Sequence, residues 1–166
     1  MDTPNILKER GVFSSMPHIH DKIDFCVEVF IVHNNKVLLR KHDKYKIWLS
    51  VGGHIELDED PTQAALREVK EEVGLEVELV PKEQVLVGLI PPVFLTRHKI
   101  NEHHEHVVLI YFARAKTDQL VLSDSEQSDG CKWFTLEELD DPVFGIIPDV
   151  VVCAKAALDA VGIYVR

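Results

Sequence analysis

Cysteine is scarce in this chain of 166 residues, which contains three, at Cys26, Cys131 and Cys153. Their number is odd and their spacings are wide, so they match neither a disulfide framework nor a zinc knuckle. We expect reduced, buried thiols of the kind found in cytosolic proteins, which makes the cytoplasm the expected location.

Basic residues are also outnumbered: 18 Lys and Arg stand against 28 Asp and Glu, for a formal net charge of −10. Proteins that bind nucleic-acid polymers neutralise phosphates with Lys and Arg, so we expect no such polymer as a partner. A small phosphorylated substrate is compatible with this charge, because bound divalent cations can reverse the local field. The one locally basic stretch, residues 36–46 with Arg40, either steers phosphates or is an exposed hairpin edge.

Long apolar runs are missing too. No run reaches the length of a membrane-spanning helix, and the N-terminus lacks the pattern of a signal peptide, so we expect no membrane partner. The sequence shows no internal repeat or linker. With 46% hydrophobic residues, we expect residues 1–166 to form a single domain, with residues 1–20 as a loose lead-in.

Strand and helix signals alternate along the remaining chain. Residues 24–33 and 36–41 predict a β-hairpin with its turn at Asn34-Asn35. Further strands are predicted over 75–80, 84–95 (bent or broken by Pro91-Pro92), 106–115 and 131–134, with polar loops between them. A capping box at Thr135–Glu138 predicts a short helix, and residues 149–160 predict a C-terminal helix. This interleaving predicts a mixed α/β or α+β fold.

A further helix is predicted from about Pro61 to Val73, with Asp60 as its N-cap and Gly74 as its stop. One stripe, expected to face the core, contains Leu66, Val69 and Val73. The adjoining face carries Glu68, Glu71 and Glu72. Three carboxylates so close together repel one another unless a cation lies between them, and oxygen ligands suit Mg²⁺ or Mn²⁺.

Residues 53–75 contain Gly53, five residues, Glu59, seven residues and then Arg67-Glu-Val-Lys-Glu-Glu-Val-Gly-Leu75. This pattern resembles the Nudix box, G-x5-E-x7-R-E-U-x-E-E-x-G-U with U aliphatic, at every fixed and aliphatic position. The resemblance implies an α/β/α sandwich around a mixed β-sheet. It also implies Mg²⁺-dependent hydrolysis of a pyrophosphate linkage, with Mn²⁺ as a substitute. Ser50-Val51 stands where the family often has a proline, which we expect to alter the loop slightly but not the chemistry.

The resemblance also implies roles for individual residues. The implied metal ligands are Gly52 through its carbonyl, Glu59, Glu68, Glu71 and Glu72. Glu59 either binds a metal or pairs with Arg67, which orients the carboxylates. The general base differs among family members, and the candidates are Glu68 and Glu71 in the box and Glu105 and Glu126 outside it. Candidates for substrate contact are Arg40, His54, Glu56 (or plain solvation) and Asp149 (or helix capping).

The histidine-rich stretch Asn101-Glu-His-His-Glu-His106 is the other unusual feature. It could bind a metal or touch a phosphate, or it could be a polar loop. Helical H-x3-H spacing is absent, but His104 and His106 would lie on one face of a strand that began there.

The leading hypothesis is a Nudix pyrophosphatase that cleaves a nucleoside diphosphate linked to another group. A MutT-like (d)NTP pyrophosphatase is preferred to an ADP-ribose or nucleotide-sugar pyrophosphatase because the chain is compact. The intact box disfavours an isopentenyl-diphosphate isomerase and a catalytically inactive nucleotide-sensing domain. A homodimer is left open, since homodimers are common among similar proteins.

Overall fold

The computed structural model describes residues 22–42, 45–80, 88–122 and 128–162. The expected lead-in over residues 1–20 and the candidate base Glu126 lie outside the described residues, as does the first part of the strand expected over 84–95.

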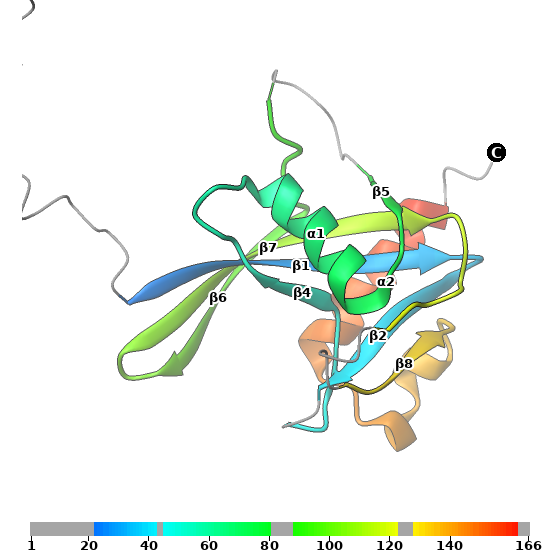
Figure 1. The fold of residues 1–166 in the computed structure, drawn as a ribbon. Helices are drawn as coiled ribbons and strands as arrows, with labels where there is room; N and C mark the ends of the chain where they lie inside the picture. The colour runs from blue at the N-terminus through cyan, green and yellow to red at the C-terminus, as the bar shows by residue number, and fades with distance from the viewer. Residues whose placement is uncertain (1–21, 43–44, 81–87, 123–127, 163–166) are drawn as a thin grey trace, which may run out of the picture.

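A mixed eight-stranded sheet forms the middle layer of the molecule (Figure 1). Its centre is β1 (Ile23–His33), which pairs in parallel with β7 (His104–Ala115) and antiparallel with β2 (Lys36–His42) and β4 (Val51–His54). The outer strands are β3 (Trp48–Leu49), β5 (Val77–Leu79), β6 (Phe94–Asn101) and β8 (Ser128–Phe134).

The two α-helices of the described residues cover opposite faces of this sheet (Figure 1). Helix α1 (Pro61–Val73) packs Ala65 and Val69 against alternate residues of β1, such as Val29. Helix α2 (Pro148–Gly162) packs onto the other face, which carries Phe30. Two short 3-10 helices, η3 (Glu138–Asp140) and η4 (Pro142–Phe144), precede α2. The expected α/β/α sandwich with a mixed sheet is confirmed.

The ends of α1 follow from its sequence and match the predicted bounds. The Asp60 carboxylate accepts hydrogen bonds from the backbone N–H groups of Thr62 and Gln63 at 2.8 and 2.9 Å. The Gln63 side chain in turn accepts from the Asp60 N–H at 2.9 Å, which completes a capping box. Gly74 ends the helix in the left-handed region, at φ +68°.

Two other local predictions are confirmed. The β1–β2 hairpin turns at Asn34 and Asn35, both at positive φ. The Thr135 and Glu138 side chains exchange hydrogen bonds with each other's backbone N–H, as a capping box requires. None of the described helices is long and apolar enough to cross a membrane.

Four expectations need correction. Residues 94–101 form β6, although no strand was expected there beyond Leu95, and β7 begins at His104. Strand β8 begins at Ser128, inside the expected loop. Leu66 is 41% exposed, so it does not belong to the core stripe; the buried face of α1 carries Ala64, Ala65 and Glu72 beside Val69 and Val73. Of the three cysteines, which form no disulfide, only Cys26 is fully buried, and Cys131 and Cys153 are half-buried.

Candidate functional site

Strand β4 brings a glycine pair against the acidic helix. Pairing of β4 with β1 sets Gly52 opposite Glu28 and Gly53 opposite Val27. A Cβ atom on Gly53 would lie 2.7 Å from the carboxyl carbon of Glu68. The missing side chain therefore gives the Glu68 carboxylate its place beside the backbone of β4.

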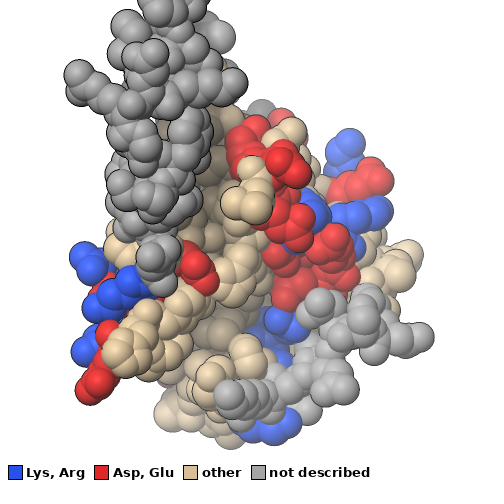
Figure 2. Space-filling model, turned by 60° about the vertical axis from the view of Figure 1, so that its left-hand side comes forward, with Lys and Arg blue, Asp and Glu red and all other residues tan. Residues whose placement is uncertain are grey.

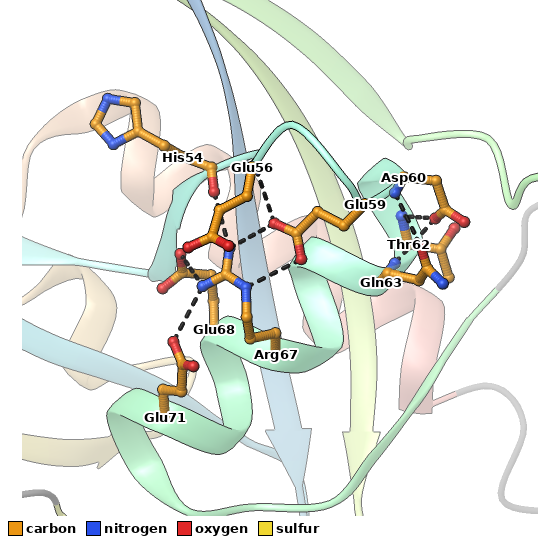
Figure 3. A network of polar contacts seen from close by, with 9 residues as sticks. All are labelled: His54, Glu56, Glu59, Asp60, Thr62, Gln63, Arg67, Glu68 and Glu71. Carbon is orange, nitrogen blue, oxygen red and sulfur yellow. Dashed lines mark hydrogen bonds and ion pairs between the residues drawn. The ribbon is translucent and has the colours of Figure 1, made fainter.

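Arg67 is the centre of the polar network on α1 (Figure 3). Its Nε and Nη2 donate to the two carboxylate oxygens of Glu59 at 3.0 and 2.6 Å, a bidentate pair. Its Nη1 donates to Glu68 at 2.8 Å and to Glu71 at 3.0 Å, and Nη2 also reaches the His54 carbonyl at 2.9 Å. One guanidinium thus binds three box carboxylates and fixes the loop to the helix.

These contacts shift the pKa values of both partners. The hydrogen bond from Arg67 holds the pKa of Glu59 below its usual range. The hydrogen bonds that Arg67 donates to Glu59, and then to Glu68 and Glu71, raise the pKa of Arg67 still higher. Arg67 and Glu59 therefore form a charged pair at neutral pH.

Glu72 points inward and is only 4% exposed. It accepts a hydrogen bond from the Gly52 N–H at 3.1 Å and forms an ion pair with Arg40, which reaches it from β2. A buried carboxylate needs such partners, because burial disfavours its charge. Arg40 therefore belongs to the box cluster.

The cluster retains an excess of negative charge. It contains four carboxylates, from Glu59, Glu68, Glu71 and Glu72, and the two guanidinium groups of Arg40 and Arg67. One divalent cation would neutralise the remaining formal charge of minus two, and carboxylate oxygens are the ligands that Mg²⁺ and Mn²⁺ prefer. Figure 2 shows acidic side chains gathered on one face of the molecule, with basic side chains beside them. The donor set fits a hard divalent cation.

The other predicted site residues differ in whether they contact this cluster. Glu56 is exposed, and its N–H donates to Glu59 at 2.9 Å. The His54 ring points away from Arg67, although its carbonyl belongs to the network (Figure 3). Asp149 lies exposed in the first turn of α2. Glu105 is bound by Arg97 and Lys22, whose hydrogen bonds lower the pKa of its carboxyl group.

The structure reveals one further acidic residue near the site, which the sequence analysis missed. Glu28 lies on β1 among apolar neighbours and accepts a hydrogen bond from the Ser50 hydroxyl at 3.0 Å. Burial raises the pKa of its carboxyl group above the usual range. The signal was present in the sequence, since Glu28 interrupts the apolar run of β1. A cavity of about 410 Å³ lies elsewhere, between the β1–β2 turn and the end of α2, and none of the box residues lines it.

Comparison with known proteins identifies the family of the chain. The model of the NUDIX domain matches residues 25–151. The chain belongs to the Nudix family. A solved Nudix-family hydrolase from Clostridium perfringens superimposes with a TM-score of 0.76 at 34% identity, over 83% of this chain and 97% of that one.

Two curated Nudix relatives share about a third of the aligned residues. The m7GpppN-mRNA hydrolase NUDT17 of Xenopus laevis is 31% identical over 128 residues, which are 69% of this chain and 42% of that protein. The ADP-ribose pyrophosphatase of Methanocaldococcus jannaschii is 33% identical over 87 residues, which are 51% of this chain and 48% of that protein. The chain therefore spans less than half the length of each of these relatives.

Proposed function

We propose that this Nudix chain is a metal-dependent pyrophosphohydrolase that cleaves a nucleoside diphosphate linked to another group. The observation that carries the proposal is the convergence of four box carboxylates and two arginines beside the Gly52-Gly53 backbone. Membership of the Nudix family, and relatives named as hydrolases, support the same chemistry.

The box carboxylates would hold Mg²⁺, or Mn²⁺ in its place: Glu59, Glu68, Glu71 and Glu72, with the carbonyl of Gly52. When bound, the cation polarises phosphoryl oxygens and acidifies a water molecule. Arg67 keeps the carboxylates oriented through its hydrogen bonds. Glu71 is the preferred general base, because its side chain is 57% exposed whereas that of Glu68 is 14% exposed.

Substrate contacts are proposed for residues around the cluster. Arg40, buried against Glu72, offers a guanidinium to a phosphate group, and Glu56 flanks the loop. A contact from His54 would come from its backbone, because its ring points away from Arg67. Asp149 is proposed to contact the group attached to the diphosphate from the start of α2.

The relatives alter the preferred substrate class. The preference for a (d)NTP rested on the compact chain, and neither curated relative described above is named for that activity. ADP-ribose and capped RNA both contain a nucleoside joined through phosphates to a second, larger group. We therefore place ADP-ribose ahead of (d)NTPs. Capped RNA is a further candidate because of the cap hydrolase among the relatives, although the net charge of −10 argues against a nucleic-acid polymer.

The test is a substrate panel with Mg²⁺ or Mn²⁺, in which products are resolved by chromatography. It contains ADP-ribose, nucleotide sugars, (d)NTPs and a cap analogue. One substrate should be turned over far faster than the rest, and only with metal. Glu72→Gln should lower kcat at least about a hundredfold, the scale of losing one charged contact at the reacting centre. Its amide oxygen can still accept from the Gly52 N–H, so the fold should survive.

Glu78→Gln is the matched control, since it removes an exposed carboxylate from β5 outside the cluster. Unchanged turnover in Glu72→Gln would overturn the site assignment. Binding of nucleotides without turnover of any substrate would favour a nucleotide-sensing domain instead.

A further inference from the structure

Three histidines and an aspartate meet at a point that the Nudix box does not include. Asp24 comes from β1, His54 from the end of β4, and His104 and His106 from the start of β7. One ligand atom from each lies within 4.8 Å of all the others. Asp24 Oδ2 is 3.6 Å from His54 Nε2 and 3.5 Å from His104 Nε2, and the Nε2 atoms of His104 and His106 are 2.8 Å apart.

Strand register explains why these four residues meet. Asp24 is paired with His106 across the parallel β1–β7 ladder, and Cys26 is paired with His54 across the β1–β4 ladder. Paired residues lie on the same face of a sheet, and so do residues two apart in one strand. All four side chains therefore lie on the face that carries Cys26, which is the α2 face. The acidic helix α1 covers the other face.

The ligand set differs in chemistry from that of the box. Three imidazole nitrogens and one carboxylate oxygen suit Zn²⁺ and similar transition-metal ions, whereas Mg²⁺ prefers oxygen ligands alone. Four protein ligands would complete a tetrahedral shell, which is typical of structural zinc sites.

Three of the six distances between ligand atoms are close to those of a tetrahedral site, and all six lie within 4.8 Å. Zn–N bonds of about 2.0–2.1 Å place tetrahedral ligand atoms roughly 3.4 Å apart. The two Asp24–histidine distances, 3.6 and 3.5 Å, already agree with this spacing. The His104 and His106 rings would have to separate by about 0.6 Å, a movement that side-chain rotation can supply. Asp24, His54 and His104 are partly exposed, so an ion can enter from solvent.

We propose that Asp24, His54, His104 and His106 form a structural Zn²⁺ site, separate from the Mg²⁺ site of the box. The bound ion would tie the end of β4 to β1 and β7. His54 connects the two sites, because its carbonyl accepts from Arg67 at 2.9 Å while its ring would bind the ion. The ion would therefore fix the last residue of β4, after which the chain leaves the sheet toward α1.

Binding of Zn²⁺ to the full chain tests this proposal directly. Chelator-treated protein is titrated with Zn²⁺ by calorimetry in excess Mg²⁺, which occupies the box carboxylates. One Zn²⁺ should bind per chain, and Co²⁺ should give the intense visible absorption of a four-coordinate complex. The substitutions His104→Ala, His106→Ala and Asp24→Asn should each weaken Zn²⁺ binding by more than the roughly 10- to 100-fold cost of losing an outer-sphere partner.

Two controls separate this site from other binding. His103→Ala removes the exposed neighbouring imidazole and should bind Zn²⁺ like the wild type. Glu72→Gln should lose turnover but keep Zn²⁺ affinity, so the two sites can fail independently. Circular dichroism establishes that each variant is folded. Equal Zn²⁺ affinity in wild type, His104→Ala and His106→Ala, or displacement of Zn²⁺ by Mg²⁺, would overturn the proposal.

Discussion

Gly53 matters because it has no side chain, which leaves room for a neighbouring carboxylate. The space where its Cβ would stand is occupied by the Glu68 carboxylate, whose second oxygen would be 2.9 Å from that atom. Because the crowded atoms are the end of a flexible side chain and not backbone, the helix could keep its place while the carboxylate moved. Gly53 therefore influences the position of one proposed metal ligand more than it influences the fold.

Gly53→Ala should for this reason separate activity from stability. We expect kcat to fall on the order of a hundredfold, the cost of displacing a catalytic group by about 1 Å. The free energy of unfolding should change by less than about 1 kcal/mol, as for substitutions that create no cavity or buried charge. Steady-state kinetics and urea unfolding measure the two effects. Gly162→Ala is the matched control, because the nearest described atom to its Cβ outside its own helix would be the Asn35 side-chain oxygen at 3.8 Å. Wild-type kcat in Gly53→Ala would refute this role.

Single residues also show where prediction from sequence stops. The spacing of Glu68, Glu71 and Glu72 placed them together on α1, but it did not show that Glu72 faces inward. That orientation depends on Arg40 and on the Gly52 N–H, which come from other strands. Leu66 was wrongly assigned to the core: its position fits the apolar stripe, yet within the described part of the chain it stays 41% exposed.

At the scale of elements, α1 is positioned by its own caps. The capping box at Asp60 satisfies backbone N–H groups that the first turn of a helix leaves without partners. Asp60→Ala should cost about 1 kcal/mol of unfolding free energy, a fall in Tm of roughly 2–4 °C for a chain of this size. Thermal unfolding followed by circular dichroism measures it. Asp60→Asn, which retains a capping oxygen, should stay close to the wild type, and a similar loss in both variants would contradict the capping account.

Elements that depend on tertiary pairing were the hardest to predict. The bounds of α1 were correct because caps and periodicity are local signals. Strand β6 was missed because its residues are mostly exposed and show no alternation of apolar and polar positions. It exists because it pairs with β7. The same pairing, continued to β1 and β4, brings His104 and His106 to Asp24 and His54, which no spacing in the sequence could show.

The whole molecule distributes two kinds of ligand over the two faces of one sheet. Carboxylates gather on the α1 face, and imidazoles gather on the α2 face near the end of β4. Without cations, the carboxylate cluster lowers the stability of the folded chain more than the histidine cluster does, because its charges add to a net charge that is already −10. The folded chain assembles this cluster, whereas the unfolded chain disperses it.

Mg²⁺ should therefore stabilise the whole folded chain by mass action, because it binds the assembled box and has little affinity for the dispersed carboxylates. At a Mg²⁺ concentration of one hundred times Kd, the gain should be about 2.7 kcal/mol, or very roughly 5–11 °C in Tm. Thermal melts at increasing Mg²⁺ and constant ionic strength measure this gain without the general screening of the net charge. Glu72→Gln should flatten the dependence on Mg²⁺, and Glu78→Gln should preserve it. An equal Mg²⁺ response in Glu72→Gln and the wild type would mean that the ion stabilises the protein from somewhere other than the box.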